Sequence, residues 1–435
     1  MKFTVEELKK ATNAEIKGNL EGNFEISTDT RTIKKGDLYL PLKGANFDGE
    51  SFCDKAMGAG AAGCFCSKDC CAEFSLKVPD TLKAYLQIAN FARKKYNPIV
   101  VAITGSSGKT TTKEMVYSVL SEKFKTHKTF SNHNNEIGFC QTVLSMPEDT
   151  DVLIIEMGMR GFGEIELITK YAEPDFAIIT NAGSAHIGRL GSLDNIAKAK
   201  CEITKYLKNT LIAQNNERIK KFADFEGEKI FYSINDTKIL EKRKGYSKFR
   251  YKGDEYELNV EGDYNIENSL SAIELGFKLG MSYEEIRLGL AKYHQIEKRW
   301  EIQEVDGYKI INDSYNANPE SMKASVSTFL ELYENPVVIL GDMGELGEKE
   351  VEFHRETGEF IGKKFQGKQA VFLTVGKLAK YIGDELAKCG FDVKHFDSNL
   401  ETSRYILDNL HAGITIFLKA SRAMKFEEII ENLKK

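Results

Sequence analysis

Short apolar runs alternate with helical patterns through most of the chain. In the middle region, Val152–Ile155, Phe176–Thr180 and Leu211–Ala213 predict buried strands, and helical patterns separate them. This alternation is typical of a mostly parallel sheet covered by helices. Polar residues follow the end of each run, at the edge where parallel sheets bind ligands. The pattern therefore predicts an α/β fold.

The same pattern divides the chain into three α/β domains. Residues 1–82 mix short strand patterns with turn signals and predict a small N-terminal domain. Residues 83–298 hold the parallel sheet and begin with a helix over 83–97. Residues 299–435 predict a Rossmann-like C-terminal domain, and the boundary should fall between Tyr293 and Gln303. Basic, weakly patterned Glu241–Tyr251 is expected to be an exposed hairpin or loop. The expected strands of the last domain are Lys309–Asn312, Val337–Leu340, Val371–Val375, Val393–Phe396 and Ile414–Leu418.

Composition and charge narrow the class of function. The 435 residues carry a net charge of −5 with both signs mixed, which gives no support for nucleic-acid binding. The N-terminal segment is polar and amphipathic and has no signal-peptide core. No apolar stretch is long enough to cross a bilayer. We therefore expect a cytoplasmic protein that does not insert into a membrane.

Five of the eight cysteines lie between Cys53 and Cys71. The C-x-C and C-C spacings differ from those of common zinc sites, and no histidine is near. Cys64 and Cys66 belong to an apolar run that starts at Ala61. We therefore expect reduced cysteines in or beside a core, rather than a zinc site or a disulfide framework.

The strongest chemical signal lies between the apolar run Ile99–Thr104 and the helical pattern Lys113–Phe124. Glycines there let backbone N–H groups face an anion, a new helix offers its positive end, and Lys109 adds a charge. The loop is shorter than G-x-x-x-x-G-K-[ST], because Ile103 occupies the first glycine position. An ordinary strand-to-helix turn would not combine these residues in this order, so a nucleoside triphosphate is the expected ligand. The predicted contacts are Gly105, Ser106, Ser107, Gly108, Lys109, Thr110 and Thr111.

Candidate metal ligands follow the neighbouring strands. Glu156 ends a buried run beside the phosphate loop and is well placed for magnesium, the alternative being a solvated acid. His186 lies in a glycine-rich segment after the next strand, where a ligand role is favoured over a structural one. Lys198 and Lys200 share the predicted helix Leu193–Leu207 but point in different directions. From spacing alone, both lysines are expected to be solvated.

Several asparagine-rich loops are candidates for substrate contacts. Asn132–Gly138 is dense in polar residues, which favours a substrate contact over simple turn formation. Asn265 and Asn268 open a helix that runs on through Leu279. Capping explains one asparagine, and base recognition can explain the other. Arg299 can reach phosphates when the domains close. Two polar loops of the last domain can dock a second substrate: Asn312–Pro319 and Gly341–Gly347.

Together these segments resemble the Mur ligase family across the whole chain. Agreement at so many ordered positions is much more specific than the phosphate loop alone. The motifs are Thr104–Thr111, Asn132–Gly138, Glu156–Gly158, Asn181–His186, Ala199–Lys200, Asn265–Asn268, Arg299 and Asn312–Ser314.

The resemblance implies an ATP-dependent amide-bond ligase of peptidoglycan precursor synthesis. Such an enzyme forms an acyl phosphate, releases ADP and phosphate, and moves its C-terminal domain with a hinge near Arg299. Asn134–Gly138, Gly163–Ile165, Asp313–Pro319 and Leu340–Gly347 are similar to members that add D-alanyl-D-alanine to UDP-N-acetylmuramoyl-tripeptide. The D-N-P-R signature of diaminopimelate-adding members is absent. The implied protein is a monomer that uses Mg²⁺.

The resemblance also assigns roles to single residues. Lys200 matches a lysine that carries a CO₂-derived carbamate in the family, which turns a cation into an anion able to help hold magnesium. The implied catalytic residues are Lys109, Glu156, His186 and Lys200, and the implied metal ligands are Thr110, Glu156, His186 and carbamylated Lys200. Asn268 and Arg299 join the ATP contacts. The implied substrate contacts are Ser27, Asp29, Arg31, Lys43, Asn134, Asn135, Asp313, Asn316 and Asn318.

Four other interpretations remain open at this point. Within the family, the chain can be a folylpolyglutamate synthetase or a different Mur ligase, which the accepted amino acid would reveal. A nucleotide-bound switch would hydrolyse ATP slowly and form no amide. A small-molecule kinase would leave phosphate on an isolable product, whereas a ligase releases it.

Overall fold

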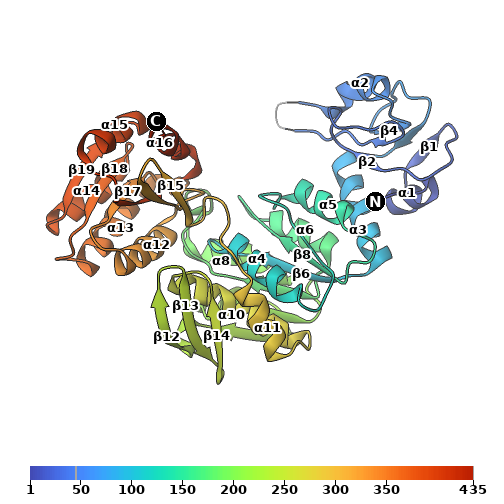
Figure 1. Ribbon diagram of the computed structural model, residues 1–435. Coiled ribbons are helices and arrows are strands. Elements are labelled where there is room, and N and C mark those ends of the chain that lie inside the picture. Colours follow the sequence, from blue (N-terminus) through green and yellow to red (C-terminus); the bar gives the residue numbers. More distant parts are fainter. Residues whose placement is uncertain (45–46, 435) are drawn as a thin grey trace.

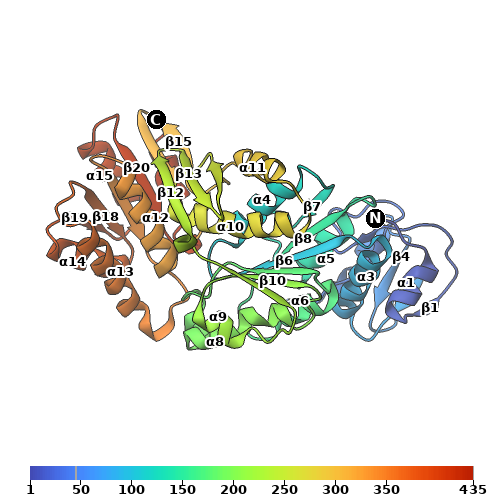
Figure 2. The same cartoon turned by 90° about the horizontal axis from the view of Figure 1, so that it is seen from below.

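Four β-sheets organise residues 1–44 and 47–434, the part of the chain that the computed structural model describes. The N-terminal and C-terminal domains lie on opposite sides of the central domain (Figures 1 and 2). Three of the sheets are mostly parallel and alternate with helices, so the predicted α/β class is confirmed. The domain boundaries at 82/83 and 298/299 stay predictions. Within the described ranges, no helix combines the length and apolarity needed to cross a membrane.

The N-terminal domain contains a five-stranded sheet in its described residues, in the order β1-β5-β4-β3-β2. Only β1 runs antiparallel to its neighbour. The fully buried strand β4 carries Cys64 and Cys66, which confirms that these cysteines belong to a core. The elements are α1 Val5–Thr12, β1 Glu15–Lys17, β2 Ile26–Ser27, β3 Leu38–Tyr39, α2 Cys53–Gly58, β4 Gly63–Cys66 and β5 Ser75–Lys77.

The central domain is built on a six-stranded parallel sheet, counted over its described residues, in the order β11-β10-β9-β6-β8-β7. Strands β6, β8 and β9 are apolar and buried because helices cover both faces. The elements are α3 Thr81–Tyr96, β6 Ile99–Thr104, α4 Lys109–Leu120, β7 Thr126–Lys128, α5 Glu136–Ser145, β8 Val152–Glu156, α6 Glu164–Ala172, β9 Phe176–Ile179, α7 Ile187–Leu190, α8 Leu193–Cys201, β10 Thr210–Gln214, α9 Glu217–Phe222, β11 Glu228–Tyr232, α10 Asp263–Lys278 and α11 Tyr283–Ala291.

A small antiparallel sheet follows β11 and corrects one expectation. It consists of β12 Thr237–Arg243, β13 Tyr246–Tyr251 and β14 Asp254–Leu258. The predicted hairpin is present, but β13 is not simply exposed, because Phe249 and Tyr251 are buried. Charged residues alternate with these buried residues along β13, so the segment reads as basic and weakly patterned in the sequence.

Two predicted helices have different bounds in the structure. Helix α4 starts directly at Lys109, not Lys113, because Gly108 adopts a left-handed conformation and begins the helix there. Helix α8 stops at Cys201 and continues only as a 3₁₀ turn over Glu202–Thr204, so the expected extension to Leu207 is wrong.

The C-terminal domain has a six-stranded sheet, within the described residues, in the order β15-β16-β20-β17-β18-β19. Strand β15 is antiparallel to β16, and the remaining pairs are parallel. The elements are β15 Glu301–Val305, β16 Tyr308–Asn312, α12 Pro319–Leu332, β17 Val337–Gly341, α13 Glu350–Lys364, β18 Val371–Val375, α14 Ala379–Lys388, β19 Asp392–Phe396, α15 Asn399–Asn409, β20 Thr415–Lys419 and α16 Glu427–Asn432.

Helix α4 is held in place by close packing against α11. A Cβ atom added at Gly289 would lie 2.4 Å from the Cα atom of Val119. The Ser118 hydroxyl donates a hydrogen bond of 2.6 Å to the Gly289 carbonyl. The absence of a side chain at Gly289 therefore lets α11 approach the helix that follows the phosphate loop.

We predict that Gly289→Ala destabilises the protein, because overpacking costs about 1–3 kcal/mol. This loss should exceed the gain of about 1 kcal/mol that alanine brings to a helix interior. Urea unfolding followed by circular dichroism measures the difference. Gly58→Ala is the control, because an added Cβ atom at Gly58 meets no atom within 4 Å. Equal stability of the two variants would contradict the packing argument.

Candidate active site

The loop between β6 and α4 has the geometry of an anion cradle. Gly105 has φ +156°, and a Cβ atom there would lie 1.8 Å from the Thr180 Oγ1 atom. Gly108, with φ +78°, stands at the N-cap of α4 and supplies no capping side chain. The first backbone N–H groups of α4 therefore face the loop without a side-chain acceptor, which suits a phosphate group.

Lys109 lies half-buried at the start of α4, with its Nζ atom donating a 2.8 Å hydrogen bond to the Gly105 carbonyl. Burial lowers the pKa of Lys109, and the Arg299 guanidinium lowers it further, whereas the Glu156 carboxylate opposes the shift. An anion bound in the cradle would favour the charged ammonium group. The local charge thus matches a phosphate ligand.

Glu156 ends β8 with its carboxylate directed to the cradle. Its Oε1 atom accepts hydrogen bonds from Thr110 Oγ1 at 3.2 Å and from Asn134 Nδ2 at 3.1 Å. Its Oε2 atom is buried and accepts no hydrogen bond. A buried carboxylate oxygen that accepts no hydrogen bond, beside a threonine hydroxyl, provides the hard oxygen ligands that Mg²⁺ prefers.

Lys113 is a neighbour of this carboxylate that the sequence pattern did not reveal. Its side chain is only 1% exposed, and its Nζ atom lies 3.5 Å from Glu156 Oε2 and 3.3 Å from Glu114 Oε1. It sits one helical turn after Lys109, on the same side of α4. The i, i+4 spacing of the two lysines indicates that both lie on one face of the helix, and this spacing could have identified Lys113 from the sequence.

Lys200 is buried, which corrects the expectation that it is solvated. It is 1% exposed, whereas Lys198 on the same helix is exposed. Lys200 shares the buried face of α8 with Ile196, four residues earlier. Burial and the nearby Lys109 cation hold the pKa of Lys200 well below its usual range. This shift favours the neutral amine, the form in which a lysine is nucleophilic.

His186 lies at the interface with the C-terminal domain. Its Nδ1 atom is 2.6 Å from Glu345 Oε2, and this contact lowers the pKa of Glu345. Two residues earlier, the Ser184 N–H and hydroxyl donate hydrogen bonds to Glu320 at 3.0 and 2.8 Å. Over the described residues, no three His, Cys, Asp or Glu side chains are grouped to hold a metal ion. The structure thus brings Thr110 next to Glu156 and turns His186 toward Glu345.

Arg299 reaches the cradle from the linker to the C-terminal domain. Its Nη2 atom donates a 3.0 Å hydrogen bond to Thr110 Oγ1, and its guanidinium carbon lies 4.0 Å from the centre of the Tyr315 ring. Lys298 and Trp300 on either side have left-handed backbones, with φ +58° and +62°. Such strain in non-glycine residues persists where surrounding contacts impose it, commonly at functional sites.

Trp300 supplies one of those contacts. It is buried, and its Nε1 atom donates a 2.8 Å hydrogen bond to Glu261 Oε1 in the central domain. Glu261 also accepts hydrogen bonds from the Tyr333 hydroxyl and from the Gly245 N–H. This buried carboxylate joins the linker, the C-terminal domain and the central domain at one point.

A cavity of 1110 Å³ unites most of the predicted site. It lies between the central and C-terminal domains, with Tyr264, Tyr293 and Gln214 among the lining residues that the sequence did not single out. Gly105 and Lys200 do not line it. The predicted residues that do are Ser106, Ser107, Gly108, Lys109, Thr110, Thr111, Asn134, Asn135, Glu156, His186, Asn268, Arg299, Asp313, Asn316 and Asn318.

Some of these polar side chains already have structural partners. Asn135 and Asn318 cap α5 and α12. The expected asparagine cap of α10 is wrong, because Gly262 occupies the N-cap and Asn265 donates to the Glu261 carbonyl. Asp313 forms a 2.6 Å ion pair with the buried Lys419, which draws the loop after β16 toward the end of β20. The local fold therefore orients these loops before any ligand binds.

The predicted contacts of the N-terminal domain lie at a different place. Ser27 and Asp29 line a cavity of 440 Å³ that also includes Gln141 of α5 in the central domain. The Arg31 guanidinium pairs with Asp29 at 2.6 Å and lowers the pKa of that carboxyl group to about 2. Arg31 and Lys43 are exposed and do not line this cavity.

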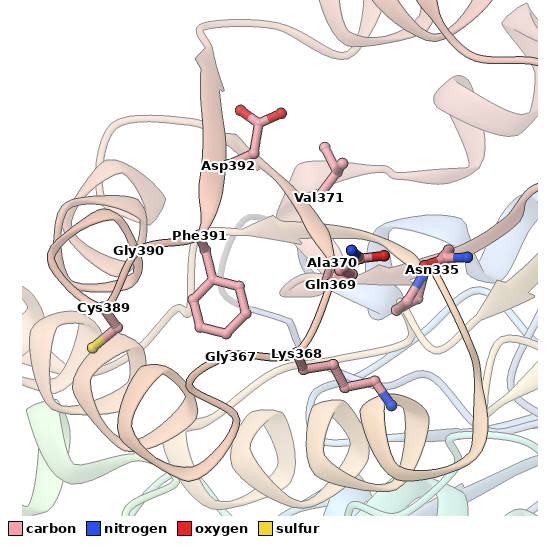
Figure 3. Close-up of a pocket in the computed structure, with 11 residues that line it drawn as sticks. Asn335, Gly367, Lys368, Gln369, Ala370, Val371, Cys389, Gly390, Phe391 and Asp392 are labelled. Carbon is pink, nitrogen blue, oxygen red and sulfur yellow. The ribbon is translucent and has the colours of Figure 1, made fainter.

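A further cavity of 480 Å³ lies in the C-terminal domain, away from the cradle. It is lined by Lys368 and by residues at the amino ends of β18 and β19, including Val371, Phe391 and Asp392 (Figure 3). Parallel sheets bind ligands at the carboxyl ends of their strands. This cavity therefore does not belong to the candidate site.

Comparison with known proteins identifies the family. Residues 103–276 match the Mur ligase middle domain, and residues 298–422 match the Mur ligase glutamate ligase domain. The chain belongs to the Mur ligase family. The resemblance seen in the sequence is confirmed, and the kinase and nucleotide-switch interpretations are set aside.

Two relatives match over nearly the whole chain. UDP-N-acetylmuramoyl-tripeptide--D-alanyl-D-alanine ligase of Bacillus subtilis is 37% identical, covering 94% of this chain and 92% of that protein. The Escherichia coli ligase of the same name is 32% identical, covering 99% and 98%. Among solved structures, MurF from Acinetobacter baumannii has a TM-score of 0.91 at 27% identity, covering 100% and 99%. MurF ligase from Thermotoga maritima in complex with ADP has a TM-score of 0.83 at 25% identity, covering 94% and 97%.

We predict that Lys109→Ala abolishes ATP-dependent turnover and leaves the fold intact. Loss of a donor aimed at developing charge costs about 10²–10³-fold in rate, and here it also removes a cation. Coupled-enzyme detection of ADP release gives the turnover, and thermal unfolding reports the fold. Lys198→Ala, which changes an exposed lysine, should keep full turnover. Unchanged turnover in Lys109→Ala would exclude this lysine as a phosphate contact.

Proposed function

We propose that the chain is an ATP-dependent ligase that joins D-alanyl-D-alanine to UDP-N-acetylmuramoyl-tripeptide in peptidoglycan precursor synthesis. One observation carries the proposal: a single cavity holds the anion cradle, the buried Glu156 carboxylate and the polar loops of the C-terminal domain. Relatives that share this printed activity match the chain over nearly its full length.

The reaction proceeds in two steps that the cavity can enclose. An oxygen of the tripeptide carboxylate attacks the γ-phosphorus of ATP, an O–P bond forms, and the bond to ADP breaks. The amine of D-alanyl-D-alanine then attacks the acyl carbon and loses a proton, and inorganic phosphate leaves. A carboxylate is a poor electrophile, so phosphorylation supplies the leaving group. Catalysis comes largely from alignment and charge neutralisation.

The chain's own residues position the phosphates. Lys109 and the N–H groups at the start of α4 bind the phosphate oxygens, and Arg299 approaches them from the linker. Asn268 lies beside Gly108, where an added Cβ atom would be 2.7 Å from its Oδ1 atom, and therefore borders the nucleotide. Asn134, Asn135, Asp313, Asn316 and Asn318 contact the peptide substrates. Closure of the C-terminal domain through Glu320 and Glu345 excludes water.

Magnesium fits the residues present. Thr110 and Glu156 would hold the ion, with His186 and a carbamate on Lys200 directly or through water. The Glu156 Oε2 atom is buried and accepts no hydrogen bond, which supports these four residues as the metal ligands. The ion, when bound, neutralises charge on the transferring phosphoryl group.

The environment of Lys200 favours carbamylation. A neutral amine attacks CO₂ and releases a proton, which leaves a carbamate anion. Burial and the Lys109 cation lower the pKa of Lys200 and so favour its neutral amine, and the same cation would stabilise the resulting negative charge. Neither the amine nor the ammonium form of a lysine has an oxygen atom to offer a metal ion, whereas a carbamate does.

The N-terminal cavity is the proposed position of the UDP-sugar end. Ser27 and Asp29 line it, and Arg31 and Lys43 lie on the exposed surface of the same domain. The proposed enzyme is cytoplasmic, because ATP and the UDP-linked precursor are cytoplasmic metabolites, and it acts as a monomer.

The proposed reaction predicts the path of one oxygen atom. With ¹⁸O in the carboxylate of UDP-N-acetylmuramoyl-tripeptide, ATP and D-alanyl-D-alanine, one label should appear in the orthophosphate. Mass spectrometry measures the phosphate, and the amide product is detected in the same sample. Label confined to the peptide product would contradict an acyl phosphate. Phosphate release with no amide would contradict the ligase assignment.

We predict that Lys200→Gln removes a carbamate signal that Lys198→Gln retains. Protein equilibrated with ¹³C-bicarbonate should show a carbamate carbon resonance in the wild type and in Lys198→Gln, because Lys200 is buried with a lowered pKa whereas Lys198 is exposed. Turnover should fall by about 10²-fold or more in Lys200→Gln, as for loss of a group that stabilises charge in the reaction. A resonance that survives in Lys200→Gln would contradict this assignment.

A further inference from the structure

Three cysteines of the N-terminal domain, Cys53, Cys64 and Cys70, belong to a small apolar core away from the candidate active site. This core lies between β3, β4 and α2 and includes Tyr39, Cys53 and Cys64, with Cys70 packed against it. All eight cysteines of the chain are free thiols. None of the roles proposed above uses them.

Two of these thiols are close enough to react with each other. The Sγ atoms of Cys64 and Cys70 are 3.2 Å apart, inside their ordinary contact distance. Cys64 is held rigidly in β4, where it pairs with Tyr39 and Ser75. Cys70 lies in the loop between β4 and β5. A bonded S–S distance is about 2.05 Å, so a small movement of the loop joins the two sulfurs.

The two cysteines differ in their access to solvent. Cys64 is fully buried, whereas Cys70 is partly exposed. A small oxidant therefore reaches Cys70 first. The buried Cys64 sulfur lies within contact distance of the Cys70 sulfur. A partly exposed thiol beside a second thiol is the arrangement found at reversible oxidation sites.

Metal binding is a weaker interpretation of the same cluster. No group of three His, Cys, Asp or Glu side chains in the described chain is arranged around a common metal position.

We propose that Cys64 and Cys70 form a reversible disulfide when the enzyme meets a peroxide, a modification that goes beyond the proposed ligase function. Hydrogen peroxide converts the Cys70 thiol to a sulfenic acid and releases water. The Cys64 sulfur then attacks the Cys70 sulfur, the S–O bond breaks, and a second water leaves with the Cys64 proton. The two thiols are oxidised, and the peroxide is reduced to water. A dithiol reductant reverses the bond by exchange.

The crosslink would fix the loop between β4 and β5 next to Tyr39. The Tyr39 hydroxyl donates a 3.0 Å hydrogen bond to the Gly49 carbonyl. Strand β3, which carries Tyr39, lies between β4 and the β2 strand that contains Ser27. Oxidation therefore acts on the sheet that supports the N-terminal cavity.

Peptide mapping of the full-length protein tests the proposal. Reduced protein is treated with hydrogen peroxide, remaining thiols are alkylated, and the protein is digested with trypsin. Cleavage after lysine places Cys53, Cys64 with Cys66, and Cys70 with Cys71 on three different peptides. We expect the thiol count to fall from eight to six, with residues 56–68 linked to residues 69–77 through Cys64 and Cys70. Dithiothreitol should restore all thiols.

Two variants separate the proposed pair from its neighbours. Cys70→Ser should lose the crosslink, and Cys71→Ser should keep it at the wild-type rate. A disulfide that joins Cys53 to Cys64, or one that involves Cys66, would overturn the assignment. So would a protein whose thiols at 64 and 70 remain free at peroxide doses that oxidise Cys71. Each result is independent of ligase activity.

Discussion

Burial of positive charge around one carboxylate is the constraint on which the site depends. Lys109 and Lys113 lie near Glu156, Arg299 donates to Thr110 beside it, and Lys200 lies close to Lys109. Glu156 and Glu114 offset part of this positive charge, and desolvation lowers the pKa of Lys109 and Lys200. A bound anion would offset the charge that remains. Nucleotide phosphates and a carbamate are anions of the required charge, so the folded apoprotein is electrostatically prepared for its substrate.

The parallel sheet brings these groups together without long loops. Strand β6 lies between β8 and β9, and Ile103 pairs with Glu156 on one side and with Ile178 on the other. The carboxyl ends of all three strands therefore meet at one edge, where the phosphate loop, the acid and the Asn181 segment contact one another. Asn181 accepts a hydrogen bond from the Ser107 N–H and closes the far side of the cradle. The buried strands fix positions that flexible loops alone would not hold.

Local pattern was sufficient to predict the class of fold, the phosphate loop and Glu156, because each depends on residues adjacent in the chain. It failed where the answer depends on distant packing. The burial of Lys200 follows from the face of helix α8 that packs into the core of the central domain, and the contact of His186 with Glu345 requires two domains to meet. The helix α10 cap was misassigned because a glycine there adopts an unusual backbone, which asparagine preference does not reveal. The roles of the site residues stay predictions.

The hydrogen bond between Trp300 and Glu261 ties the linker to the central domain beside the cradle. A rotation of the C-terminal domain about this point would displace each side chain in proportion to its distance from it. Arg299 precedes Trp300 in the chain, whereas Glu345 belongs to the loop after β17. Such a rotation would separate Glu345 from His186 and leave the Arg299 side chain near Thr110.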